Sequence, residues 1–136
     1  MGINKVHEWE QAIVTLLNID GWDLEWCGGG FKHYDAKGKT PKGKNCVLEI
    51  KVRKKWYVNK MIEKYKLDKL ISEDCVALYF VADPKGNYLY WLNDIELPKV
   101  VDMYCPDTTL WTKKKVLKPC YLLPEEQAHR VNSYAN

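Results

Sequence analysis

The sequence predicts a mixed α/β fold, an α+β arrangement with a mixed sheet, and three observations support that prediction. Apolar residues recur at helical spacing near the N-terminus and again after residue 58. Several short segments alternate apolar and polar residues, as strands with one buried face do. The segment Val76 to Ala82 is almost wholly apolar, which is typical of a central strand buried on both faces.

Composition favours one soluble domain over residues 1–136. Hydrophobic residues make up 46% and charged residues 29% of the chain, which argues against disorder. No apolar run approaches the ~20 residues of a membrane span, and the polar N-terminus lacks the apolar segment of a signal peptide. The five cysteines are widely spaced without a CxxC pair, which predicts free thiols. We therefore expect a cytoplasmic protein that has no membrane partner.

The first half of the chain predicts one helix and three strands. The helix covers residues 4–18, where one apolar stripe runs at helical spacing until Asp20-Gly21 ends it. The three strands follow at residues 22–27, 31–36 and 47–53. A glycine triplet predicts a turn between the first two strands, and the polar segment 37–45 predicts a loop before the third.

The second half predicts a helix over residues 58–72, the central strand described above, and a hairpin after it. Residues 83–86 have the composition of a type I turn, with Pro second and Gly fourth, and residues 88–92 pair back as a strand. A last helix is predicted from Pro124 to Val131, because Pro suits the first helical position. The predicted order is αβββαββ, followed by a less regular tail.

Basic residues are concentrated in the middle of the chain. Between Lys32 and Lys69 there are 13 basic and 4 acidic residues, a net charge of +9 in a chain whose total is +3. Because Lys and Arg displace counterions from phosphates, this basic centre at 32–69 predicts nucleic acid as a partner. A solvated lysine-rich face is the alternative and the commoner cause of such runs. The residues expected to contact nucleic acid are Lys37, Lys39, Lys42, Lys44, Arg53, Lys54, Lys55 and Lys64.

Two carboxylates and a lysine meet on the second and third predicted strands. Glu49 and Lys51 share one face of a strand, ~7 Å apart, and Asp35 can approach Glu49 across a hairpin. Adjacent carboxylates repel each other unless a cation is bound, and hard oxygen ligands suit Mg²⁺ or Mn²⁺. Such a metal lowers the pKa of a bound water, which Lys51 would orient for phosphodiester hydrolysis. A simple surface ion pair between Glu49 and Lys51 is the alternative.

Asp35, 13 intervening residues and Glu49-Ile50-Lys51 resemble the motif of the PD-(D/E)xK nuclease superfamily. The predicted order resembles its restriction-endonuclease-like αβββαβ core over residues 4–92, with an extra strand, which leaves 93–136 as an irregular C-terminal extension. The resemblance implies that Asp35 and Glu49 bind the metal and that Lys51 is the catalytic lysine. One departure is that Tyr34, rather than proline, precedes Asp35.

The superfamily often places one more acid on the first helix, where Glu8 and Glu10 are candidates. At ~100° per residue, Glu10 lies at the edge of the apolar stripe and Glu8 lies on the solvent side. We therefore expect Glu10 to reach the sheet as a third catalytic and metal-binding carboxylate. The alternative is a surface carboxylate that interacts favourably with the helix N-terminus.

Other residues near this predicted site have two interpretations each. His33 could contact phosphate, although a lone histidine is more often structural. Trp56 and Tyr57 could stack on bases or belong to the core. Lys60 and Lys64 lie one turn apart on the expected second helix, where they would continue the basic centre.

The predicted function is a metal-dependent deoxyribonuclease that uses Mg²⁺ to hydrolyse phosphodiester bonds of DNA, with RNA left open as a substrate. The chain resembles small phage or mobile-element nucleases, including Holliday-junction-resolvase-like members, and a phage-encoded protein would act in the host cytoplasm. A resolvase is expected to be a homodimer, since cutting two strands symmetrically needs two sites. The alternatives are a non-catalytic nucleic-acid-binding module that uses residues 32–69, and a partner-binding protein without nuclease activity.

Overall fold

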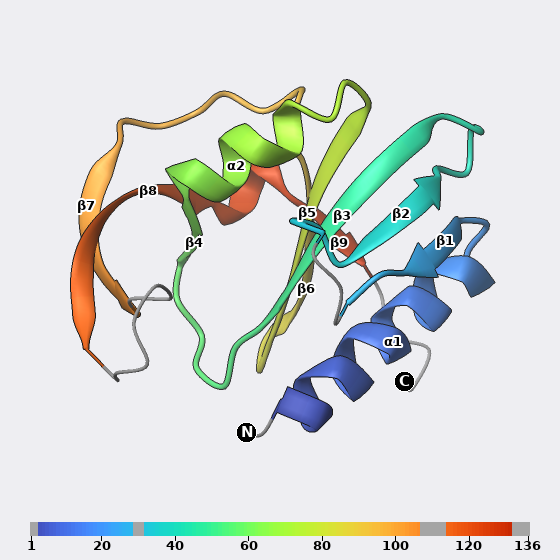
Figure 1. Ribbon diagram of the computed structural model, residues 1–136, viewed down its shortest axis with the longest axis horizontal. Helices are drawn as coiled ribbons and strands as arrows, with labels where there is room; N and C mark the ends of the chain where they lie inside the picture. The colour runs from blue at the N-terminus through green and yellow to red at the C-terminus, as the bar shows by residue number, and fades with distance from the viewer. Residues whose placement is uncertain (1–2, 29–31, 107–113, 132–136) are drawn as a thin grey trace.

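The computed structural model describes residues 3–28, 32–106 and 114–131 and confirms the mixed α+β class (Figure 1). In chain order the elements are α1 (Ile3–Ile19), β1 (Asp23–Trp26), β2 (Ala36–Lys39), β3 (Asn45–Val52), β4 (Asn59–Glu63), α2 (Lys64–Ile71), β5 (Val76–Asp83), β6 (Gly86–Trp91), β7 (Val101–Pro106), β8 (Lys115–Pro124), a 3-10 turn (Glu125–Gln127) and β9 (His129–Val131). No helix among these residues is long and apolar enough to cross a membrane.

A six-stranded mixed sheet forms the centre of the molecule, in the order β1-β2-β3-β5-β6-β9. Strands β3 and β5 are parallel, and the other neighbours in this sheet are antiparallel. A parallel pair needs a crossover connection, which β4 and α2 supply here. The central position of β5 explains its apolar sequence, because the residues from Ala77 to Val81 are all buried.

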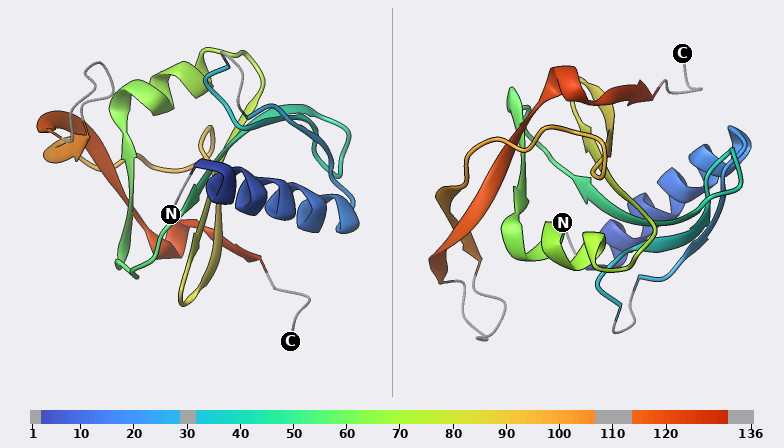
Figure 2. Two further views of the ribbon diagram at one scale, coloured as in Figure 1. Left: turned by 60° about the horizontal axis from the view of Figure 1, so that its bottom comes forward. Right: turned by 90° about the horizontal axis from the view of Figure 1, so that it is seen from above.

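Each face of this sheet is covered by a hydrophobic cluster of its own, with α1 on one side and α2 on the other (Figure 2). The α1 cluster includes Leu17, Leu48 and Ile50, and the α2 cluster includes Leu70 and Val47. Strand β3 therefore sends Leu48 and Ile50 toward α1 and alternate residues toward α2. This is the alternation predicted for the third strand.

A second, three-stranded sheet in the order β4-β8-β7 forms a curved arm beside α2 (Figure 1). Strand β8 pairs with β4 through residues 120–124, and its Tyr121 and Leu123 belong to the α2 cluster. Strand β9 then returns to the main sheet and pairs with β6. The C-terminal extension is thereby joined to both sheets.

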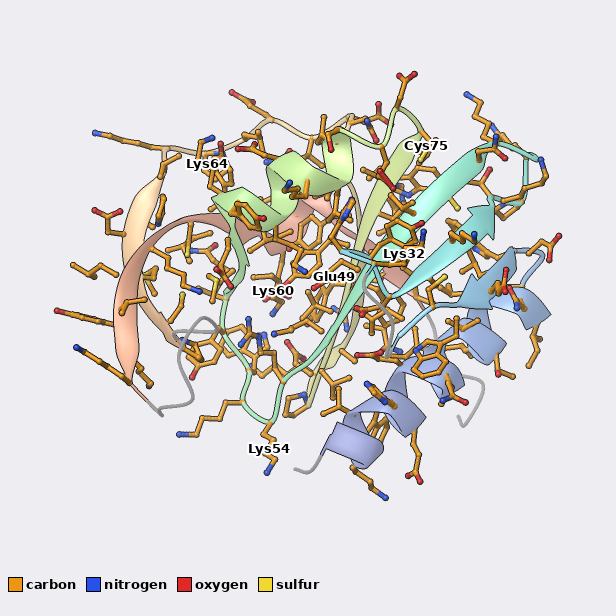
Figure 3. The ribbon with its side chains drawn as sticks, in the orientation of Figure 1. Lys32, Glu49, Lys54, Lys60, Lys64 and Cys75 are labelled. Atoms are coloured by element: carbon orange, nitrogen blue, oxygen red, sulfur yellow. The ribbon has the colours of Figure 1, made fainter. Side chains whose placement is uncertain are left out.

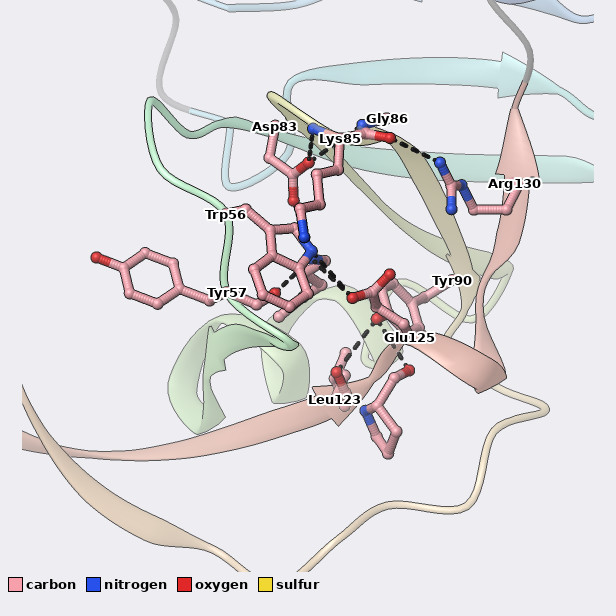
Figure 4. A network of polar contacts seen from close by, with 11 residues as sticks. Trp56, Tyr57, Asp83, Lys85, Gly86, Tyr90, Leu123, Glu125 and Arg130 are labelled. Carbon is pink, nitrogen blue, oxygen red and sulfur yellow. Dashed lines mark hydrogen bonds and ion pairs between the residues drawn. The ribbon is translucent and has the colours of Figure 1, made fainter.

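A buried lysine connects β4 to the β5–β6 hairpin and to the 3-10 turn. Lys60 lies inside the molecule (Figure 3), and its Nζ is 2.8 Å from Asp83 Oδ2 and 3.6 Å from Glu125 Oε2. Figure 4 labels both of these acids. Its ammonium group also lies 4.2 Å from the centroid of the Tyr88 ring. The side chains of Lys60 and Asp83 are only 3% and 1% exposed, so each charge depends on the other for compensation. The prediction that Lys60 continues a nucleic-acid-binding surface is therefore wrong.

The predicted strand at 31–36 is displaced along the chain. Strand β2 begins at Ala36 and ends at Lys39, within the segment predicted as a loop, and residues 33–35 form a bend. Gly38 explains the difference, because a Cβ at Gly38 would lie 1.9 Å from the backbone oxygen of Asp23 on β1. This glycine permits close strand pairing rather than marking a loop.

The predicted helix at 58–72 is half strand and half helix. Residues Asn59–Glu63 form β4, and only Lys64–Ile71 are helical. The spacing of Val58, Met61 and Ile62 imitates one face of a helix, but these residues belong to or adjoin a strand that pairs with a segment some sixty residues later. Such long-range pairing overrides local pattern, because what stabilises a strand is its partner.

Two further predictions concern turns and termini. The hairpin at residues 83–86 is confirmed, since Asp83 Oδ1 accepts hydrogen bonds from the backbone N–H groups of Lys85 and Gly86. The predicted helix from Pro124 to Val131 is wrong, because only Glu125–Gln127 form a 3-10 turn and β9 follows. All five cysteines are free thiols, as predicted.

Replacing Lys60 should strongly destabilise the fold. Lys60→Met leaves the buried Asp83 carboxylate without its partner, and breaking a buried pair in this way costs about 3–5 kcal/mol. Urea unfolding followed by circular dichroism measures this loss. The matched control is Lys64→Met, which removes a lysine whose partner Asp68 is exposed, 2.6 Å away, and which should change stability little. Equal effects of the two variants would contradict the assigned role of Lys60.

Candidate active site

Asp35 lies directly before β2 and is held from both sides by backbone hydrogen bonds. Its N–H donates to the Leu48 carbonyl over 2.8 Å, and its own carbonyl accepts from the N–H of Cys27 over 2.7 Å. Its carboxylate Oδ2 accepts a hydrogen bond from the N–H of Ile50 over 2.8 Å. The register that pairs Ala36 with Leu48 therefore brings Asp35 beside Glu49, as the hairpin argument predicts.

Glu49 lies on the α2 side of β3, near the centre of the molecule (Figure 3). Its side chain is only 13% exposed. Burial, followed by the negative charge of Asp35, raises the pKa of the Glu49 carboxyl to about 8. Glu49 therefore holds its proton to a higher pH than an ordinary carboxyl group does, and it hydrogen-bonds Asp35. A divalent cation bound between the two carboxylates would replace that proton.

Glu10 extends from α1 toward the same site. It is 7% exposed, and its Oε1 accepts a hydrogen bond over 3.1 Å from the indole N–H of Trp26 on β1. Burial raises the pKa of the Glu10 carboxyl and the charge of Asp35 adds to that rise, whereas the Trp26 hydrogen bond opposes it. Glu8 is exposed and pairs with Lys5 at 3.8 Å. The choice of Glu10 as the sheet-facing acid is confirmed, and its role as a metal ligand stays a prediction.

Two lysines act electrostatically on these acids. Lys51 is exposed, two residues along β3 from Glu49, and its charge lowers the pKa of both Glu49 and Glu10. Lys66, on α2, lies with its Nζ 3.7 Å from Glu49 Oε2. The sequence does not identify Lys66, because a helix predicted from residue 58 does not reveal which residues of α2 face the sheet.

The donor set suits a hard divalent cation. Mg²⁺ in proteins usually takes one or two carboxylates and completes its shell with water and phosphate oxygens. The adjacent carboxylates of Asp35 and Glu49 fit that requirement. Within residues 3–28, 32–106 and 114–131, no group of three or more His, Cys, Asp or Glu side chains is arranged to hold a metal ion. The predicted three-carboxylate set with Glu10 is thus not preassembled in the described part of the chain.

The expected nucleic-acid contacts differ in accessibility. Arg53 is half-buried and hydrogen-bonds the hydroxyl of Tyr79, and Lys64 is engaged with Asp68. Trp56 and Tyr57 are 37% and 57% exposed, so neither belongs to the core. The six remaining lysines are all exposed: Lys37, Lys39, Lys42, Lys44, Lys54 and Lys55.

His33 lies beside the carboxylate pair in sequence but is held elsewhere. Its Nε2 lies 3.5 Å from Glu73 Oε2, and its ring makes an edge contact with Tyr34 at a centroid distance of 5.4 Å. Among the described residues, this buried nitrogen forms no hydrogen bond. The geometry favours the structural interpretation of His33.

No family model and no curated protein matches the chain. Among solved structures, the 1.6 Å structure of Archaeoglobus fulgidus Hjc, a Holliday junction resolvase from an archaeal hyperthermophile, matches with a TM-score of 0.60. The two sequences are 13% identical, and the match covers 91% of this chain and 89% of that chain. The likeness confirms the predicted fold.

The raised pKa of Glu49 makes stability depend on pH in a defined direction. The folded state binds this proton more tightly than the unfolded state, whose pKa is near 4.5, so stability falls as pH rises from about 4.5 to about 8. In Glu49→Gln, the free energy of unfolding should decrease with pH less steeply than in the wild type, by up to about 1.4 kcal/mol per pH unit. Urea unfolding at pH 5 and pH 9 in EDTA measures the difference. The same pH dependence in wild type and variant would contradict the assignment.

Proposed function

We propose that this chain is a Mg²⁺- or Mn²⁺-dependent nuclease that hydrolyses phosphodiester bonds of DNA. The observation that carries the proposal is the pair of adjacent carboxyl groups, Asp35 and Glu49, beside Lys51. The fold is that of Hjc, which is a Holliday junction resolvase. A cytoplasmic homodimer is part of the proposal, since symmetric cutting of two strands needs two sites.

The residues divide the chemistry between them. A divalent cation held by Asp35 and Glu49 would polarise the scissile phosphate and lower the pKa of a bound water. The backbone N–H of Ile50 keeps the Asp35 carboxylate oriented toward Glu49. The exposed ammonium group of Lys51 orients the attacking water and balances charge that builds on the phosphate. Glu10, which extends from α1 toward the same site, would be a further carboxylate for the cation.

Exposed lysines next to this site supply the contacts to DNA. Lys37 and Lys39 follow Asp35 in β2, and because strand residues two apart share a face, both lysines lie on one face of the sheet. Lys54 and Lys55 follow β3 at its Lys51 end. These side chains would neutralise phosphates on both sides of the cut, which accounts for the concentration of basic residues between 32 and 69.

Loss of Lys51 should abolish cutting without loss of the fold. The substrates are labelled single-stranded, duplex and four-way-junction DNA, each with Mg²⁺, Mn²⁺ or EDTA. We expect metal-dependent cutting by the wild type and a decrease of roughly 10²-fold or more for Lys51→Ala. The control Lys69→Ala removes an exposed lysine of α2 and should cut normally. Salt-sensitive DNA binding without cutting would instead support a non-catalytic binding module.

Loss of Asp35 should remove cation binding. Asp35→Asn keeps an oxygen that can accept the Ile50 hydrogen bond but loses the negative charge that attracts the cation. Calorimetric titration with Mn²⁺ should show one site in the wild type. The affinity of the variant for Mn²⁺ should be weaker than that of the wild type by roughly tenfold or more. Asp23→Asn, which removes an exposed acid of β1, should bind Mn²⁺ as the wild type does. Unchanged affinity in Asp35→Asn would rule out the carboxylate pair as the metal site.

A further inference from the structure

An aromatic groove lies on the α1 side of the main sheet, away from the carboxylate pair. It encloses ≈ 610 Å³ between the 40–44 turn and the β6 and β9 strands. Its floor is formed by Leu89 and by three rings, those of Trp22, Trp91 and His129. The centroids of the two tryptophan rings are 5.6 Å apart, and the Trp91 and His129 centroids are 6.5 Å apart.

The two tryptophans are available to a ligand. Each is half-buried, so part of each indole surface faces the groove. Among the described residues, neither indole N–H of Trp22 or Trp91 donates a hydrogen bond, in contrast to those of Trp26 and Trp56. Flat aromatic surface with unused N–H donors fits a planar, hydrogen-bonding ligand such as a nucleobase.

The rim of the groove carries positive charge. Lys42 and Lys44 project from the turn between β2 and β3, both are exposed, and neither forms an ion pair with a described residue. Asp94 is the single acidic residue among the described residues that line the groove. The excess of positive charge over an aromatic floor favours a ligand that combines a base with a phosphate.

The position of the groove relates it to the proposed active site. Strand β2 leads from Asp35 past Lys37 and Lys39 to the 40–44 turn, and its four residues span about 13 Å. A DNA strand that is cut beside Asp35 can therefore reach Lys42 and Lys44 a few nucleotides away. The volume lies within the range of about 300–1,000 Å³ found for small-ligand sites.

We propose that this groove binds an unpaired nucleotide of single-stranded DNA, with its base stacked on Trp22 or Trp91 and its phosphate held by Lys42 and Lys44. The choice of DNA rests on the proposed function. The groove gives the protein a contact that a fully paired duplex does not satisfy, because paired bases do not expose their faces. It therefore directs the enzyme to DNA that contains an unpaired segment.

The test is binding of a fluorescein-labelled twelve-nucleotide oligothymidine, measured by anisotropy and tryptophan quenching in EDTA so that no cutting occurs. Trp91→Leu should weaken binding roughly tenfold or more. Lys42→Gln/Lys44→Gln, which alters only exposed side chains, should weaken binding and decrease the salt slope by roughly 1–2. The control Lys69→Gln/Lys115→Gln removes the same charge from exposed residues that do not line the groove.

Each outcome decides the proposal. Oligothymidine binding that is unaffected in both groove variants would overturn it, and so would binding of blunt duplex alone. Thymidine monophosphate that competes as well as the oligonucleotide would make the groove a site for free nucleotides and would also overturn it. Because the readout is binding, failure of the nuclease proposal leaves the result intact: groove-dependent binding without any cutting would support the groove alone.

Discussion

The pairing of β3 with its two neighbours is the constraint on which the site depends. On one side β3 pairs in parallel with β5, which fixes it in the centre of the sheet, and on the other it pairs with β2. Successive side chains of β3 point to opposite faces of the sheet, so Ile50 lies in the α1 cluster, and its backbone N–H donates a hydrogen bond to the Asp35 carboxylate. Because neighbouring strand residues point to opposite faces, Glu49 points toward α2, where burial and the negative charge of Asp35 raise the pKa of its carboxyl group. One strand therefore sets both the core and the chemistry of the acids.

Local patterns predicted the parts of the fold whose stability is local or strongly periodic. The N-terminal helix, the alternation of β3, the buried β5 and the Asp83 turn were all foreseeable, because spacing and turn residues report directly on them. The juxtaposition of Asp35 and Glu49 was foreseeable as well, since two antiparallel strands joined by a short connection bring these positions together. The orientation of Glu10 followed from helical geometry alone.

The remaining features depend on contacts between distant segments, which no local pattern contains. The apolar residues of β4 have the spacing of a helix, but this segment is a strand because it pairs with β8, which lies far along the chain. Lys66 could not be assigned to the site until the start of α2 at Lys64 fixed which residues face Glu49. Lys60 looked like one more member of a basic run, and only Asp83 and Glu125 reveal it as a buried ion.

The Lys60 cluster also bears on how the chain folds as it is made. Strand β4 is synthesised about sixty residues before Glu125 and before the β8 residues with which it pairs, which at ~5–20 residues per second is a delay of roughly 3 to 12 s. Until β8 is made, β4 lacks the partner strand that it has in the folded protein, and Lys60 lacks Glu125 even after Asp83 has been synthesised. The nascent protein therefore completes its second sheet late. Until then β4 has an unpaired edge that chaperones or a second nascent chain can bind.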